Sequence, residues 1–187
     1  MENKSNRKAI FLDRDGTIIK DNHYVHKIKD VEFYKCTFEA LRKMQEKGYL
    51  LFITSNQAGI GRGYYTEKEY YEVTNYILNE LLKNGVKITK TYFAPYYENA
   101  IDPKYRQGEH LRKPNIGMLL LAQKEFNIDF KKSFMIGDKI TDIIAGKNAG
   151  CKTIFVLTGQ GKKELEFTDD CEPDYICKDI GDAVRYI

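Results

Sequence analysis

The stretch KAIFLDRDGTII, residues 8–19, decides the fold. Its apolar run Ala9–Leu12 has the composition of a buried parallel strand. The run ends on Asp13, Asp15 follows after one residue, and a Gly-Thr pair then turns the chain away. Two carboxylates at the end of a buried strand require a cause, because a buried charge is costly unless it is paired or binds a cation.

Strand-like apolar runs alternate with helical patterns along the rest of the chain. The pattern predicts strands at residues 8–12, 49–54, 88–94, 132–136 and 152–156 and around Tyr175. It predicts helices at residues 37–47, 66–83, 115–126 and 139–148 and from Asp179. This alternation is typical of an α/β protein in which helices cover both faces of a doubly wound, mostly parallel sheet. With 187 residues and no low-complexity linker, we expect a single domain over residues 1–187.

Composition and charge limit the possible partners. Apolar residues make up 42% of the chain and charged residues 30%, which is ordinary for a globular protein. The net charge of +3 is too small to argue for nucleic acid or a membrane surface as a partner. The N-terminal segment MENKSNRK lacks the apolar centre of a signal peptide, and no apolar run is as long as a membrane span. We therefore expect a cytoplasmic protein without a nucleic-acid or membrane partner. We also expect a monomer, although nothing in the composition determines the oligomeric state.

Polar side chains follow the predicted strands, and the carboxyl ends of parallel strands meet at one edge of a sheet. The first strand is followed by the two aspartates, the second by SNQA, the third by a long loop that ends in RKP, and the fourth by GDK. We expect the following residues to share one crevice: Asp13, Asp15, Ser55, Arg112, Lys113, Asp138, Lys139 and Asp142.

The chemistry of this set favours a phosphoryl group and a magnesium ion. Clustered carboxylates repel one another unless a cation lies between them, and oxygen ligands without histidine or cysteine suit Mg²⁺. Magnesium together with lysine suits phosphoryl transfer. Taken singly, Asp15 could belong to a turn, Ser55 could cap the next segment, and Asp138 could be a helix N-cap. Their order after successive strands favours the site over these separate interpretations.

Four motifs in order, FLDRDGT, TSNQ, RKP and GDKITD, resemble those of the haloacid dehalogenase superfamily of phosphatases. The segments DNHYVH, SNQAGIGRG and RKPNIGM are most similar to the group of heptose-bisphosphate and histidinol-phosphate phosphatases within it. The resemblance implies a Rossmann-like sheet of the haloacid dehalogenase type without a large cap domain. It also implies that the two long loops, residues 20–30 and 95–114, shape the substrate pocket.

The resemblance assigns catalytic roles to individual residues. Asp13 would be the nucleophile that forms an aspartyl-phosphate, and Asp15 would be the general acid and base. Mg²⁺ would lie between Asp13, the backbone carbonyl of Asp15, and Asp138. Ser55 and Lys113 would hold the phosphoryl oxygens.

The resemblance also implies a substrate pocket. Substrate contacts are expected from Asp21, Asn22, His23, Tyr24, Asn56, Gln57, Ala58, Arg112 and Lys139. Asp142, one helical turn after the predicted metal ligand Asp138, would orient Lys139 or a water molecule.

The implied activity is a magnesium-dependent phosphomonoesterase acting on a small sugar phosphate. The substrate would be D-glycero-D-manno-heptose 1,7-bisphosphate, which would lose its 7-phosphate during synthesis of nucleotide-activated heptose for lipopolysaccharide or surface glycans. A histidinol-phosphate phosphatase is an open alternative. A polynucleotide 3′-phosphatase is another, although the chain has no GxxxxGK[ST] kinase motif and little net charge. A catalytically dead binding module is disfavoured by the intact Asp13, Asp15 and Asp138.

The chain departs from the family pattern in the loop before RKP. The family commonly carries a zinc site there, with a CxH pair early in the loop and a CxC pair at its end. This sequence has Ala94-Pro95-Tyr96 and Glu109-His110-Leu111 at those places, and residues 95–114 contain no cysteine. A tetrahedral structural zinc site needs four nitrogen or sulfur ligands. We therefore predict no structural zinc, and a loop held by packing of Tyr96, Tyr97 and Tyr105 on the domain.

Overall fold

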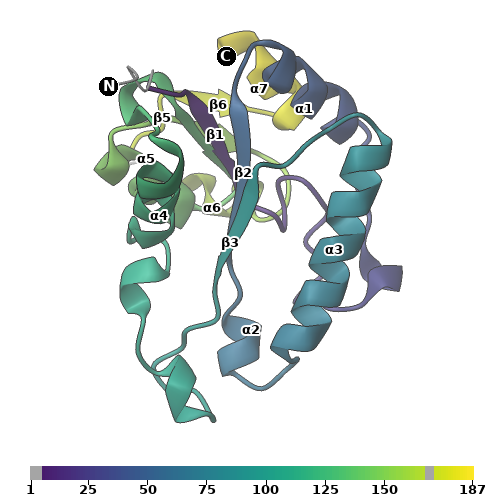
Figure 1. The fold of residues 1–187 in the computed structure, drawn as a ribbon, viewed down its shortest axis with the longest axis vertical. Helices are drawn as coiled ribbons and strands as arrows, with labels where there is room; N and C mark the ends of the chain where they lie inside the picture. Colours follow the sequence, from purple (N-terminus) through teal and green to yellow (C-terminus); the bar gives the residue numbers. More distant parts are fainter. Residues whose placement is uncertain (1–5, 167–170) are drawn as a thin grey trace.

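The computed structural model describes residues 6–166 and 171–187, and one parallel sheet runs through it (Figure 1). The strand order is β3-β2-β1-β4-β5-β6. The strands are β1 (Ala9–Leu12), β2 (Leu50–Asn56), β3 (Lys90–Ala94), β4 (Phe134–Gly137), β5 (Lys152–Val156) and β6 (Tyr175–Cys177). The predicted doubly wound parallel sheet is confirmed. Its direction of winding reverses at β1, which pairs with β2 on one side and β4 on the other.

Helices cover both faces because the strands alternate apolar side chains between two buried surfaces. On β1, Ile10 and Leu12 belong to the core under one set of helices, whereas Ala9 and Phe11 belong to the core under the other. The first set is α1 (Thr37–Glu46), α3 (Glu67–Lys83) and α7 (Ile180–Ala183). The second set is α4 (Gly117–Phe126) and α5 (Ile140–Ala149).

Shorter helices occupy the connections. Two are α-helical, α2 (Ala58–Gly61) and α6 (Gly161–Glu164). The 3-10 turns are η1 (Ile28–Asp30), η2 (Pro103–Tyr105), η3 (Glu109–Leu111), η4 (Phe130–Lys132) and η6 (Val184–Tyr186). Among the described residues, no helix combines the length and the apolar character that a membrane crossing requires.

Element boundaries follow local chemistry where the sequence carries a cap. The predicted capping box opens α3, with the Glu69 backbone N–H donating to Thr66 Oγ1 at 3.2 Å and the Thr66 N–H donating to Glu69 Oε2 at 2.8 Å. The end of β2 differs from the prediction. Ser55 and Asn56 belong to the strand, because β3 continues to pair alongside them up to Ala94. The orientation of both side chains is therefore set by the sheet rather than by a loop.

The long loop of residues 95–114 extends beyond the carboxyl end of the sheet, at the bottom of Figure 1 beside α2. The hydroxyl of Tyr105 donates to Glu67 Oε1 at 2.6 Å, and Tyr105 also packs against a buried cluster around Tyr65 and Tyr70. Tyr96 packs on the core beneath α4. The predicted packing is confirmed for Tyr96 and Tyr105, whereas the ring of Tyr97 lies under the guanidinium of Arg62.

Candidate active site

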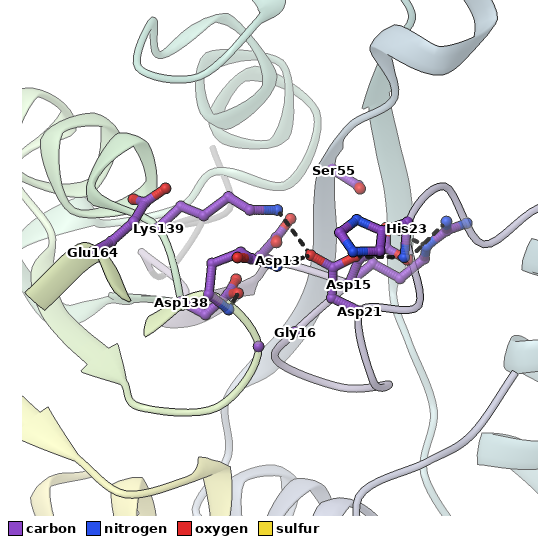
Figure 2. Close-up of polar contacts among 12 residues, drawn as sticks. Asp13, Asp15, Gly16, Asp21, His23, Ser55, Asp138, Lys139 and Glu164 are labelled. Carbon is purple, nitrogen blue, oxygen red and sulfur yellow. Dashed lines mark hydrogen bonds and ion pairs between the residues drawn. The ribbon is translucent and has the colours of Figure 1, made fainter. Parts of the chain in front are cut away.

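The ends of β1, β2 and β4 bring the predicted site residues together at one edge of the sheet. The backbone N–H of Asp13 donates to Ile136 O at 2.9 Å, which carries the pairing of β1 with β4 one residue beyond the strand. Figure 2 shows Asp13, Asp15 and Ser55 on neighbouring strand ends, with Asp138 beside Asp13. The side chains of Asp13, Ser55 and Asp138 are buried.

Lys113 joins two of the buried carboxylates. Its Nζ lies 2.8 Å from Asp13 Oδ1 and 2.6 Å from Asp142 Oδ1, and it donates to the carbonyl of Thr54 at 2.6 Å. Burial by itself raises the pKa of Asp13, but the charges of Lys113 and Lys139 outweigh burial and hold that pKa below its usual value. Burial likewise lowers the pKa of Lys113, and the two carboxylates more than reverse this. Both groups are therefore charged at neutral pH.

Asp142 contacts both lysines of the site. Its Oδ1 pairs with Lys113, and its Oδ2 accepts, at 3.1 Å, the backbone N–H of Lys139, which is the N-cap residue of α5. It thus contacts the main chain of Lys139 by a hydrogen bond, and its charge also acts on the Lys139 ammonium. Burial raises the pKa of Asp142 to about 6, against the opposing effect of the Lys113 charge.

Asp138 is a buried carboxylate with an unused ligand atom. Its Oδ2 accepts the backbone N–H of Gln160 at 2.7 Å, while its Oδ1 has no hydrogen-bond partner. Burial, reinforced by the charge of Asp13, raises the pKa of Asp138 to about 8. Oxygens of Asp13, Asp138 and Asp142 lie within 4.8 Å of one another. An orphaned carboxylate oxygen in an all-oxygen cluster fits a hard divalent cation.

Two glycines make room for this carboxylate. A Cβ on Gly16 would lie 2.1 Å from Asp138 Oδ2, and a Cβ on Gly159 would lie 2.2 Å from the same atom. Gly16 also has φ +91°, a left-handed conformation that side chains disfavour. The glycine of FLDRDGT is therefore fixed by both the turn and the approach of Asp138.

The Asp15 carboxylate is held by hydrogen bonds from two neighbouring side chains, Arg14 and Gln57. The guanidinium of Arg14 donates from Nε to Asp15 Oδ2 and from a terminal nitrogen to Oδ1, both at 3.0 Å. The Gln57 side chain adds a third donor, with Nε2 2.9 Å from Asp15 Oδ2. Arg14 is itself buried and also donates to the carbonyl of Val25.

A cavity of about 310 Å³ opens next to Asp15. Six of the predicted substrate-binding residues line it, namely Asp21, His23, Tyr24, Asn56, Gln57 and Lys139. In Figure 2, the Lys139 side chain reaches across the site, and its Nζ lies 3.8 Å from Asp21 Oδ2. Burial lowers the pKa of Lys139, but the surrounding carboxylates, chiefly Asp13 and Asp138, hold it above its usual value.

The other predicted substrate-binding residues lie elsewhere. Asn22 is exposed and donates to Asp30 O at 3.2 Å. Ala58 is buried at the start of α2. Arg112 lines a second cavity, of about 330 Å³, on the other side of Lys113.

Arg62 lines this second cavity together with Arg112. Its guanidinium stacks 4.0 Å above the ring of Tyr97, and its buried Nε has no hydrogen-bond partner. Burial, together with the charge of Arg62, lowers the pKa of Arg112. Among the described residues, neither arginine lies within ion-pair distance of a carboxylate, although Glu98 and Glu109 line the same cavity. The cavity therefore presents two guanidinium groups that are not engaged in an ion pair among the described residues.

Several site residues escaped the sequence analysis. Gln160 lies in the loop after β5, where it donates to Asp138 from its backbone and to Asp21 from its side chain at 3.1 Å. The rule that ligands lie at strand ends, applied to the fifth strand as well, would have found it. Arg14 and Tyr65 carried no such signal, because their roles depend on which way a side chain turns inside the fold.

A parallel sheet whose first strand ends on a lysine-paired aspartate, with a second aspartate two residues later, defines the haloacid dehalogenase class of phosphatases. In agreement, the HAD-hydrolase-like family model matches residues 110–183. The chain belongs to the family of D-glycero-D-manno-heptose-1,7-bisphosphate 7-phosphatases, and the curated relatives with that name are phosphatases, as this chain is.

Two of these relatives cover most of the chain. A D-glycero-alpha-D-manno-heptose-1,7-bisphosphate 7-phosphatase from Campylobacter jejuni is 45% identical over 86% of this chain and 87% of its own length. A D-glycero-beta-D-manno-heptose-1,7-bisphosphate 7-phosphatase from Pasteurella multocida is 40% identical over 97% of both. Among solved structures, D,D-heptose 1,7-bisphosphate phosphatase from B. bronchiseptica, complexed with magnesium and phosphate, shares the fold with a TM-score of 0.85. It is 23% identical and covers 96% of this chain and 97% of its own.

Proposed function

We propose that this phosphatase removes the 7-phosphate of D-glycero-D-manno-heptose 1,7-bisphosphate, in the synthesis of nucleotide-activated heptose for surface glycans. The observation that carries the chemistry is the buried Asp13–Lys113 pair, 2.8 Å long, with Asp15 beside it at the mouth of a cavity. The names of the relatives support the choice of sugar.

The reaction proceeds in two displacements at phosphorus. An Asp13 carboxylate oxygen attacks and forms an aspartyl-phosphate, while the bond from phosphorus to the sugar oxygen breaks. Asp15 gives that leaving oxygen a proton. A water molecule then attacks the aspartyl-phosphate, Asp15 takes a proton from it, and Asp13 and inorganic phosphate are released. One water molecule is consumed for each ester bond cleaved.

Ser55 and Lys113 would hold the phosphoryl oxygens. Ser55 Oγ accepts a hydrogen bond from Gln57 Nε2 at 2.7 Å, so the hydroxyl proton of Ser55 remains free to be donated to the substrate. Lys113 is held between Asp13 and Asp142, which fixes its ammonium at the reacting centre. Donors fixed in advance stabilise developing charge more than mobile ones do.

The carboxylates of Asp13 and Asp138 and the backbone carbonyl of Asp15 would hold Mg²⁺. When bound, the ion would neutralise the carboxylates and the phosphoryl oxygens. The unpartnered Oδ1 of Asp138 supports this assignment.

The second cavity would receive the phosphate that is not cleaved. Arg62 and Arg112 offer guanidinium groups without a carboxylate partner among the described residues, and guanidinium binds phosphate well. Lys113 lines both this cavity and the pocket that contains Asp13 and Asp15. The site for the uncleaved phosphate would therefore adjoin the site of the reaction. This arrangement favours a bisphosphate over a monophosphate.

A substrate panel tests the proposal. We expect kcat/KM to be highest for one or both anomers of heptose 1,7-bisphosphate, lower for the 7-monophosphate, and lowest for histidinol phosphate and a 3′-phosphorylated oligonucleotide. Arg62→Ala should remove most of the preference for bisphosphate over monophosphate. Asp13→Asn serves as the inactive control, with a loss on the order of 10³-fold or more. A higher kcat/KM for histidinol phosphate than for either bisphosphate would refute the proposed substrate.

We further propose that the enzyme works in the cytoplasm as a monomer. All the groups assigned to the site come from one chain, so a single copy suffices. Size-exclusion chromatography with light scattering tests the oligomeric state, and cell fractionation tests the location.

A further inference from the structure

The amide of Gln57 uses all four of its hydrogen-bonding positions inside the protein. Its Nε2 donates to Asp15 Oδ2 at 2.9 Å and to Ser55 Oγ at 2.7 Å. Its Oε1 accepts from the hydroxyl of Tyr65 at 2.5 Å and from Arg14 at 3.4 Å. Gln57 is 3% exposed, so water does not compete for these positions.

The hydrogen-bonding groups around the Gln57 amide determine its orientation. A guanidinium can only donate hydrogen bonds. Rotating the amide by half a turn would place its NH₂ group against the guanidinium of Arg14, donor against donor. Gln57 must therefore turn its oxygen to Arg14 and present its NH₂ group to Asp15 and Ser55.

Tyr65 makes the shorter of the two hydrogen bonds to the Gln57 side-chain oxygen. Its side chain is buried, and burial raises the pKa of Tyr65, so the hydroxyl remains a donor throughout the working pH range. The ring approaches the chain closely at Gly59, where a Cβ would lie 2.2 Å from Tyr65 Cε1. The ring of His26 stacks against Tyr65 with the centroids 5.3 Å apart. Tyr65 is thus held in place independently of Gln57.

We infer that Tyr65 is a positioning residue that acts through Gln57, holding Asp15 and Ser55 in a fixed relation. The Tyr65 hydroxyl bonds to Gln57 and not to either of these side chains; the amide of Gln57 links the hydroxyl to both. Gln57 thereby has a role besides lining the substrate cavity. The inference rests on the acid–base role proposed above for Asp15.

The test compares substrates that differ in their need for a proton on the leaving group. Tyr65→Phe keeps the ring and removes the hydroxyl. For the sugar phosphate we expect kcat/KM to fall about tenfold, a fraction of what general acid–base catalysis contributes. For p-nitrophenyl phosphate, whose leaving group needs no proton, we expect a clearly smaller loss. Tyr71→Phe, an exposed tyrosine on α3, is the matched control and should leave both values unchanged.

A double-mutant cycle tests whether the effect passes through Gln57. If it does, Gln57→Ala combined with Tyr65→Phe is no slower than Gln57→Ala alone. Full additivity of the two losses, or equal losses for the two substrates, would overturn the inference. Asp15→Asn separates this inference from the proposed function: an active Asp15→Asn enzyme refutes the role of Asp15. An inactive one together with an unimpaired Tyr65→Phe refutes the role of Tyr65 alone.

Discussion

The unpartnered oxygen of Asp138 makes the stability of the metal-free enzyme depend on pH. The pKa of Asp138 rises from 3.8 to about 8 on folding, so between these values the folded chain binds a proton that the unfolded chain has released. Proton binding to the folded state stabilises it, and this contribution is lost as the pH rises through 8. We expect the Tm of the metal-free protein to fall between pH 6 and pH 9.

Mg²⁺ should raise the Tm more at pH 9 than at pH 6, because the ion binds the ionised carboxylate and competes with the proton. Differential scanning calorimetry at both values of pH measures the effect. Asp138→Asn is the control, since the amide does not titrate. If Asp138→Asn retained the full pH dependence, the effect would belong to another group.

Lys113 should matter for stability as well as for turnover. Removing its ammonium leaves the buried carboxylates of Asp13 and Asp142 unpaired, which typically costs about 3–5 kcal/mol. Lys113→Ala should therefore lower the free energy of unfolding by an amount of this order, and lower kcat about 10²-fold. Urea denaturation and steady-state kinetics measure the two effects.

The matched control for Lys113 is Lys90→Ala. Lys90 pairs with Glu125 at the surface at 2.6 Å, and an exposed pair contributes about 1 kcal/mol or less. Equal losses of stability in the two variants would contradict the buried pairing of Lys113.

At the scale of elements, the loop of residues 95–114 is held by aromatic and polar contacts. Besides the Tyr105–Glu67 bond, the backbone N–H of Tyr97 donates to Tyr105 O at 3.0 Å, and Arg106 donates to Ala100 O at 2.8 Å. We expect purified protein to contain no stoichiometric zinc, since residues 95–114 offer one histidine and no cysteine. A zinc-selective chelator in excess Mg²⁺ should leave the Tm unchanged.

Tyr105→Phe should instead lower the Tm by a few degrees, because a hydrogen bond to a charged group contributes about 1.5–3 kcal/mol. About one zinc ion per chain after extensive dialysis would contradict the expectation for this loop. It would mean that ligands from outside the loop complete a metal site.

Helices and strands that a short sequence pattern identifies could be predicted from the sequence. The contacts that their side chains make could not. The apolar run of β1 and the capping box of α3 each identify an element from a few adjacent residues. The end of β2 was placed too early, because Ser55 and Asn56 are poor indicators of a strand and remain in it only through pairing with β3. Pairing between distant segments has no signature in a short window of sequence.

At the scale of the whole molecule, the parallel topology of the sheet explains why the residues at the strand ends could be predicted to form one site. The carboxyl ends of β1, β2 and β4 must share an edge, so Asp13, Ser55 and Asp138 could be brought together before any coordinates. The topology of the sheet does not determine which carboxylate pairs with a given lysine or arginine. The pairing of Lys113 with Asp142, and of Arg14 with Asp15, follows from packing in three dimensions.

The hydrogen bonds between Asn56 and Lys113 separate the positioning of Lys113 from the contacts that hold the rest of the long loop. The amide of Asn56 accepts the backbone N–H of Lys113 at 3.0 Å and donates to its carbonyl at 2.9 Å, so the reactive end of the loop is anchored to β2. This anchor does not involve whatever fastens the rest of the loop. The backbone of Lys113 therefore keeps its place beside β2 independently of the tyrosine contacts that hold the earlier part of the loop. The earlier part of the loop is free to vary in sequence, because hydrogen bonds to β2 position the last residues of the loop.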